Sequence, residues 1–163
     1  MGRSKRTPGA SADRRDTVDE LNRLMAEEAE ACLRYFQMRF RLREKDYLAA
    51  EQLFEEAIKE TLEHATSIGQ QIRALGHIPT LHISLSLGGG PIRLETALAE
   101  ALDVEQQALE AYKDFLPRVA GDPMLEDFIR RQVEVETAHV QEIRDFVRDK
   151  SLVKLVPRRK TGR

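Results

Sequence analysis

The segment Val135–Val140 places a glutamate and a histidine on a helix face that should be buried. Glu136 and His139 stand three residues apart, and three residues on an α-helix turn through about 300°, so both side chains point the same way. An ionised glutamate in an apolar core is costly unless another group compensates its charge. A divalent metal ion would compensate both groups at once, so this segment predicts a metal site inside a helical core. The apolar residues of the same face are Leu125, Phe128, Val135, Ile143 and Phe146.

Composition limits the kind of protein that can surround such a site. The chain has 163 residues, 41% of them hydrophobic, which suits one domain with a single core. Charged residues make up 33% and tryptophan is absent, which is typical of long amphipathic helices rather than a β-sandwich. Cys32 is the only cysteine, which excludes an intrachain disulfide and favours a reducing compartment. With no recognisable secretory signal and no apolar run near the ~18 residues of a membrane span, we expect a cytoplasmic protein.

The net charge of −2 hides an uneven distribution. Residues 1–16 carry five Lys/Arg against two Asp, and residues 150–163 carry six Lys/Arg and no acid, so residues 17–149 carry a net charge of −11. An acidic body is not expected to bind nucleic acid. It is expected either to form an ordinary solvated helical surface or to attract cations through its field.

Capping and breaking residues set the expected boundaries of four helices. Thr17 and Glu20 form a capping box, and Asp46 is a candidate N-cap for a second helix that Gly76 ends. Asp122 is followed by a proline, which is favoured at the first helical position. The expected segments are a disordered basic arm over 1–16, helices over about 17–43, 47–75, 92–119 and 123–150 within a domain of residues 17–150, and a basic C-terminal tail over 151–163.

The one long connection, residues 77–92, determines how the helices are arranged. Residues 82–87 alternate like a strand, but no partner strand is available, so we expect an extended crossover. Gly88, Gly89 and Gly90 are not followed by Lys-Ser/Thr, so they do not form a phosphate-binding loop. Two helical hairpins joined by a long crossover between the second and third helices predict an all-α antiparallel four-helix bundle of ferritin type.

Further acids and a second histidine occupy the inward faces of the other helices. Glu28 lies on the apolar face of the first helix and Glu105 on that of the third. His64 lies on the apolar face of the second helix, with Glu60 four residues before it. Carboxylates and imidazoles together suit two iron ions, with manganese or zinc as alternatives, better than calcium. The candidate metal ligands are Glu28, Glu60, His64, Glu105, Glu136 and His139.

The spacing of these residues repeats. Glu28 precedes His64 by 36 residues and Glu105 precedes His139 by 34, which indicates two halves around one central site. Tyr35 follows Glu28 by seven residues and is a candidate catalytic, redox-active residue, although a tyrosine in such a position is more often a core residue. Tyr112, seven residues after Glu105, is interpreted as a core residue.

Residues 18–149 resemble the bacterioferritins. The resemblance lies in Leu21–Leu24 leading to Glu28 and Tyr35-Phe36, in Glu60 with His64-Ala65 and Ile78-Pro79, in Glu105, and in Glu136-x-x-His139. It implies a ferritin-like bundle, a di-iron ferroxidase centre, and assembly into a hollow shell that stores ferric mineral.

Three positions depart from that family. The family carries Glu-x-x-His in its second helix, whereas Thr61 stands three residues before His64; we expect a one-residue π-bulge that turns Glu60 to the metal. The alternative is a straight helix with Thr61 inward and a slow or inactive subunit. The family's axial haem methionine would fall at Thr61 or Leu62, so no haem is expected. Pro157 would break the family's short fifth helix, which helps shell assembly.

These observations lead to a ranked set of functions. The first is a haem-free ferroxidase that oxidises Fe(II) with dioxygen or peroxide, binds two iron ions per chain and stores iron in a homo-oligomeric shell. The second is a rubrerythrin-like di-iron peroxidase or oxidase, which the absence of a rubredoxin-type cysteine cluster disfavours. The third is a non-catalytic subunit of a mixed shell, or a cargo protein that docks through its basic tail. No membrane partner is expected.

Overall fold

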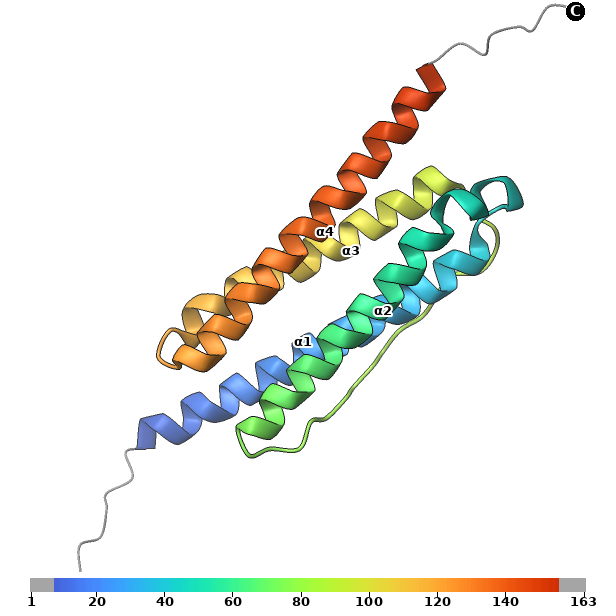
Figure 1. The fold of residues 1–163 in the computed structure, drawn as a ribbon. Helices are drawn as coiled ribbons and strands as arrows, with labels where there is room; N and C mark the ends of the chain where they lie inside the picture. The colour runs from blue at the N-terminus through green and yellow to red at the C-terminus, as the bar shows by residue number, and fades with distance from the viewer. Residues whose placement is uncertain (1–7, 156–163) are drawn as a thin grey trace, which may run out of the picture.

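The computed structural model describes residues 8–155, and within this range four long α-helices form two hairpins (Figure 1). Helix α1 packs mainly against α2, and α3 against α4. This arrangement confirms the all-α antiparallel four-helix bundle with a long crossover between the second and third helices. The elements are α1 (Pro8–Arg41), α2 (Glu44–Ala74), α3 (Leu94–Phe115), the short 3-10 helix η1 (Leu116–Val119) and α4 (Pro123–Leu155).

Helix α1 begins earlier than its capping box indicates. The helix starts at Pro8, so Thr17 lies inside it and residues 8–16 of the expected arm are helical; residues 1–7 lie outside the described part of the chain. Proline is well suited to a first turn, where its missing N–H is not needed, and the alanines and arginines that follow are good helix formers. Helix α4 likewise continues past Lys150 to Leu155.

The junction between α1 and α2 is tighter than expected. Asp46 is not the N-cap of α2: Arg43 occupies that position without a side-chain cap, and the helix begins at Glu44. The end of the crossover is bonded to this junction, because the Ile92 N–H donates to the Arg41 carbonyl at 2.8 Å and Ile92 forms an isolated β-bridge with Leu42.

The other helix ends follow the sequence signals. Gly76 follows α2 with a φ of 85°, the left-handed conformation that favours glycine. Pro117 lies in η1, so the regular part of α3 ends one turn early, as its position predicts. Asp122 caps α4, since its Oδ1 accepts the N–H groups of Met124 and Leu125, each at 3.2 Å.

The crossover, residues 75–93, runs along the α1–α2 hairpin (Figure 1). Four residues of α1 hold it by hydrogen bonds: Asn22 to Thr80, Glu30 to Ser84, Gln37 to Gly88 and Arg41 to Gly90. These residues span about 29 Å of helix, and the ten-residue advance from Thr80 to Gly90 reaches about 33 Å when extended. The expectation of an extended crossover is therefore correct, and the crossover fixes where α3 begins relative to α1.

The apolar core consists of two clusters with a polar layer between them. One cluster includes Leu21, Ile68, Ile72, Phe115 and Ile129. The other includes Met38, Leu42, Phe54, Leu98 and Ile143. The buried polar residues of the described chain, Glu28, Thr61, Glu105, Gln132 and Glu136, fall between these clusters in sequence on every helix. Within residues 8–155, none of the helices has an apolar stretch suited to crossing a bilayer.

Replacing Gly76 with alanine should destabilise the protein by about 1 kcal/mol, because an alanine side chain is strained at positive φ. A Cβ at Gly76 would meet no atom within 4 Å, so the effect is confined to the backbone. Gly121→Ala is the matched control: a Cβ there also meets nothing, and Gly121 lacks a positive φ, so its effect should stay within about 0.5 kcal/mol. Urea unfolding measures the free energy of unfolding of both variants. Equal losses would contradict the view that Gly76 is needed for its positive φ.

Candidate metal centre

Three carboxylates and two imidazoles from four helices meet in the polar layer. Glu28 of α1 and Glu105 of α3 are each 4% exposed, and Glu136 of α4 is 1% exposed. His64 of α2 and His139 of α4 lie beside them with their rings stacked, 5.6 Å between centroids and 11° between planes. Each of these residues stands on the inward face that helical periodicity assigns to it, so the bundle brings five of the six sequence-predicted ligands together.

The five residues form two triads that share Glu136. In the first, His64 Nδ1 lies 3.5 Å from Glu28 Oε2 and 3.0 Å from Glu136 Oε1. In the second, His139 Nδ1 lies 3.3 Å from Glu105 Oε2 and 3.6 Å from Glu136 Oε2. Within each triad the ligand atoms lie within 4.8 Å of one another. Each triad offers two carboxylates and one imidazole nitrogen, and Glu136 directs one oxygen to each.

Two tyrosines hold the outer carboxylates across the bundle. Tyr112 of α3 donates its hydroxyl to Glu28 Oε1 of α1 at 2.6 Å. Tyr35 of α1 donates to Glu105 Oε1 of α3 in the reciprocal arrangement. Burial raises the pKa of both phenols well above the ordinary value, so both remain protonated donors. Tyr112 is therefore more than a core residue, and its seven-residue distance from Glu105, equal to that of Tyr35 from Glu28, was the signal in the sequence.

Burial and mutual contact shift the pKa values of the three glutamates and two histidines. Burial raises the pKa of Glu28 and of Glu105. Burial also opposes ionisation of Glu136, but its contacts with the two histidines outweigh that effect and lower its pKa to about 2. Burial disfavours the imidazolium forms of His64 and His139, yet the neighbouring carboxylates raise each pKa to about 10. In the metal-free protein, protonated histidines therefore supply the positive charge that the carboxylates require.

The donor set fits divalent metal ions. His64 Nδ1 and Glu136 Oε1 are fully buried and form an ion pair at 3.0 Å, but the pair lacks the geometry of a well-formed hydrogen bond. A metal ion between them would satisfy both atoms and would replace the histidine protons as the source of positive charge. Mixed carboxylate and imidazole donors suit iron, manganese or zinc.

The predicted π-bulge in the second helix is wrong. Helix α2 is a regular α-helix from Glu44 to Ala74. Thr61 turns inward at 5% exposure, where its hydroxyl donates to the Ala57 carbonyl at 2.8 Å. This local bond satisfies the buried hydroxyl, so the helix accommodates Thr61 without a bulge. The Glu60 side chain is 45% exposed and lies outside both triads, with its Oε2 3.4 Å from His139 Nε2.

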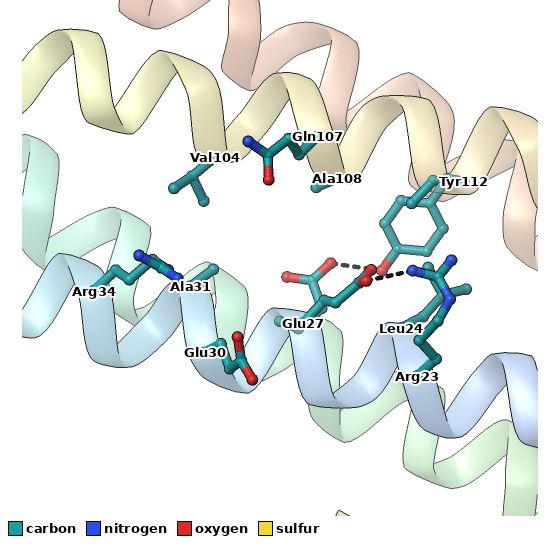
Figure 2. A pocket seen from close by; sticks show the side chains of 12 residues that line it. Arg23, Leu24, Glu27, Glu30, Ala31, Arg34, Val104, Gln107, Ala108 and Tyr112 are labelled. Atoms are coloured by element: carbon teal, nitrogen blue, oxygen red, sulfur yellow. Dashed lines mark hydrogen bonds and ion pairs between the residues drawn. The ribbon is translucent and has the colours of Figure 1, made fainter. Parts of the chain in front are cut away.

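A pocket of about 260 Å³ lies between α1 and α3 and reaches Glu28 and Tyr112 (Figure 2). Figure 2 shows Tyr112 pointing from α3 toward α1, and Glu27 beside Arg23, with which it forms an ion pair. Two arginines and three glutamates line the pocket along with apolar residues. The centre therefore has a polar approach from the outer surface of the α1–α3 pair.

The chain matches a known protein family. The family model of the ferritin-like domain matches residues 18–153. No curated protein sequence matches the chain significantly.

Solved structures share the fold at low sequence identity. A dodecameric thioferritin, the bacterioferritin-related protein from Bacteroides fragilis, has a TM-score of 0.77 at 20% identity, covering 90% of this chain and 92% of that chain. Dps from Thermosynechococcus elongatus has a TM-score of 0.76 at 16% identity, covering 85% and 94%. The bacterioferritin of Desulfovibrio desulfuricans, which has a diiron site, has a TM-score of 0.72 at 21% identity, covering 90% and 85%. These likenesses establish the fold alone.

The metal-free protein should lose stability as the pH rises from about 6.5 toward 10. His64 and His139 have folded pKa values of about 10, above the ordinary 6.5, so their contribution is fully present below 6.5 and declines as the pH rises through 10. Chemical unfolding of protein stripped with a chelator measures this slope. The His64→Gln/His139→Gln variant should lose the part of the slope that the histidines supply; an unchanged slope would contradict the pairing.

Proposed function

Because the chain belongs to the ferritin-like domain family, we propose that it is a haem-free ferroxidase of bacterioferritin type that oxidises Fe(II) and stores the product in an oligomeric shell. We place it in the cytoplasm and propose two iron ions per chain, bound by Glu28, His64, Glu105, Glu136 and His139. The observation that carries the proposal is the shared carboxylate Glu136, with one oxygen directed to each triad. Such a carboxylate is suited to bridge two metal ions.

The surroundings of the triads suit the oxidation of ferrous ions, which are the substrate. Bound iron supplies the electrons, and dioxygen or peroxide accepts them. Glu28, Glu105 and Glu136 are buried carboxylates whose negative charge favours the higher oxidation state of iron. Burial also strengthens each electrostatic interaction and excludes bulk water.

The tyrosines have separate tasks in this proposal. Tyr112 orients Glu28 and Tyr35 orients Glu105, each through a phenol that remains protonated. Tyr35 is also the proposed redox-active residue, because its hydroxyl touches a ligand of the second triad. The pocket between α1 and α3 provides the route by which ferrous ions reach Glu28.

Storage requires subunit assembly, and two features support it. Leu33, Phe36 and Phe40 are exposed on one stretch of α1, and Phe36 and Phe40 pack edge to face at 5.1 Å. Contiguous exposed apolar side chains are typical of interaction surfaces. The structurally similar protein from Bacteroides fragilis is dodecameric. A homo-oligomeric shell is proposed first and a mixed shell with another ferritin-like chain second; mass measurement of the purified protein together with its iron content distinguishes them.

One observation favours a second candidate, a slow subunit whose main role is to build the shell. Thr61 occupies the inward position of α2 and leaves that helix without a buried carboxylate in either triad. The initial rate of iron oxidation by the isolated protein separates the two: a fast phase that saturates at two Fe(II) per chain supports the ferroxidase, and its absence supports the shell subunit.

Glu136→Ala should abolish the fast phase of Fe(II) oxidation, reducing the initial rate at least about tenfold, because both triads lose a ligand. Glu105→Ala should remove only the second position and lower the tight Fe(II) stoichiometry from two to one. Aerobic Fe(II) titration followed by absorbance measures rate and stoichiometry. Glu63→Ala is the control, since Glu63 is on the exposed side of α2 and pairs with Lys59. A wild-type rate in Glu136→Ala would refute the site.

Purified protein should show no haem Soret band, even after incubation with haem. Leu62 is exposed and apolar, and the Thr61 hydroxyl is bound to the helix backbone, so neither offers the soft ligand that haem iron requires. Absorption spectroscopy after removal of free haem checks this. A stoichiometric b-type spectrum would contradict the prediction and would indicate that a methionine or histidine elsewhere in the chain binds the haem iron.

A further inference from the structure

Glu60 meets His139 on the side opposite to the triads. His139 directs Nδ1 to Glu105 and Glu136 at 3.3 and 3.6 Å, so its Nε2 faces outward. There Nε2 lies 3.4 Å from Glu60 Oε2. A histidine that binds metal through Nδ1 carries its proton on Nε2, and this N–H requires an acceptor. Glu60 is the carboxylate at that place.

The two triads differ in this respect. Glu60 stands four residues before His64 on α2 and reaches across to His139 on α4. In the repeat that relates the two halves, the matching residue is Val135, four residues before His139 on α4. A valine side chain accepts no hydrogen bond. The bundle therefore places a carboxylate beside Nε2 of His139, whereas the matching position in the other half, Val135, offers His64 no acceptor.

The regular backbone of α2 explains why Glu60 lies outside the two triads. Because α2 continues without a bulge, Thr61 takes the inward position and Glu60 remains on the rim, 45% exposed. The Thr61 hydroxyl bonds to Ala57 and does not compete for His139. Glu60 also lines a small pocket with Glu105 and His139, so it borders the second triad.

We propose that Glu60 is a positioning residue that accepts the Nε2–H of His139 and thereby holds Nδ1 toward a divalent metal ion in the second triad. The inference rests on the proposed function, since it requires metal at this centre. Glu60 therefore acts through His139 and not as a metal ligand. It fixes the tautomer and ring orientation of His139 and makes the imidazole a stronger metal ligand. The second metal position, unlike the first, depends on this support.

Substitution by glutamine separates positioning from direct ligation. The amide oxygen of glutamine accepts an N–H bond, so Glu60→Gln should retain the orientation of His139. An uncharged amide is a poor replacement for a carboxylate that binds metal directly, so the same variant would lose a metal position if Glu60 were a ligand. Glu60→Ala removes both the hydrogen-bond acceptor for His139 and any direct metal ligand. Glu63→Ala is the exposed control on the same helix.

The experiment is a Co(II) titration of the full-length protein in its native assembly, with paramagnetic proton NMR of the loaded form. The unchanged protein should bind two Co(II) per chain and show a hyperfine-shifted, exchangeable N–H signal from each ligating histidine. Glu60→Ala should weaken one of the two equivalents by about tenfold to a hundredfold and speed solvent exchange of one N–H signal. Glu60→Gln should restore that signal and the affinity.

Each other outcome overturns the proposal in a distinct way. If Glu60→Ala leaves both N–H signals and both affinities unchanged, Glu60 does not position His139, while the proposed metal centre stands. If Glu60→Gln loses one Co(II) as Glu60→Ala does, Glu60 is a direct ligand. If the unchanged protein binds no Co(II), both this inference and the proposed function fail.

Discussion

The burial of three carboxylates inside a helical bundle is the constraint on which the structure depends. Glu28, Glu105 and Glu136 are almost fully enclosed, and each ionised carboxylate placed in such surroundings carries a large desolvation cost. His64 and His139, which take up protons in the metal-free state, meet this cost in part. Apolar clusters lie on either side of these charges along the bundle. Divalent or trivalent metal ions could therefore replace the histidine protons as the positive charge beside these carboxylates.

The geometry of the centre depends on the register between the two hairpins. Tyr35 of α1 reaches Glu105 of α3, and Tyr112 of α3 reaches Glu28 of α1, so a shift of one turn would break both bonds. The crossover prevents such a shift, because α1 holds it by hydrogen bonds along its length and Ile92 bonds to Arg41 where the crossover meets α3. The longest irregular segment of the described chain therefore has a structural role in aligning the ligands.

Helical periodicity predicts the bundle and the inward position of the five residues that meet in its polar layer, because an amphipathic helix shows its buried face directly. Local signals were weaker guides. Thr17 has the pattern of a cap, but helix-forming residues precede it and the helix continues through it. The predicted bulge rests on the spacing of the similar family, which has a glutamate three residues before the histidine of its second helix. Here Thr61 holds that position, and its hydroxyl bonds to Ala57, so a regular helix accommodates it. The Tyr112–Glu28 contact joins residues 84 positions apart and depends on a register that periodicity does not specify.

In the proposed centre, Glu136 would lie between two metal ions, one held by each half of the chain. Crystals soaked anaerobically with Fe(II) and measured at the iron absorption edge test this claim most directly. We expect two anomalous peaks per chain inside the bundle, one beside Glu28 and His64 and one beside Glu105 and His139, with Glu136 contacting both. A single peak shared by all five residues, or iron only at the protein surface, would contradict it.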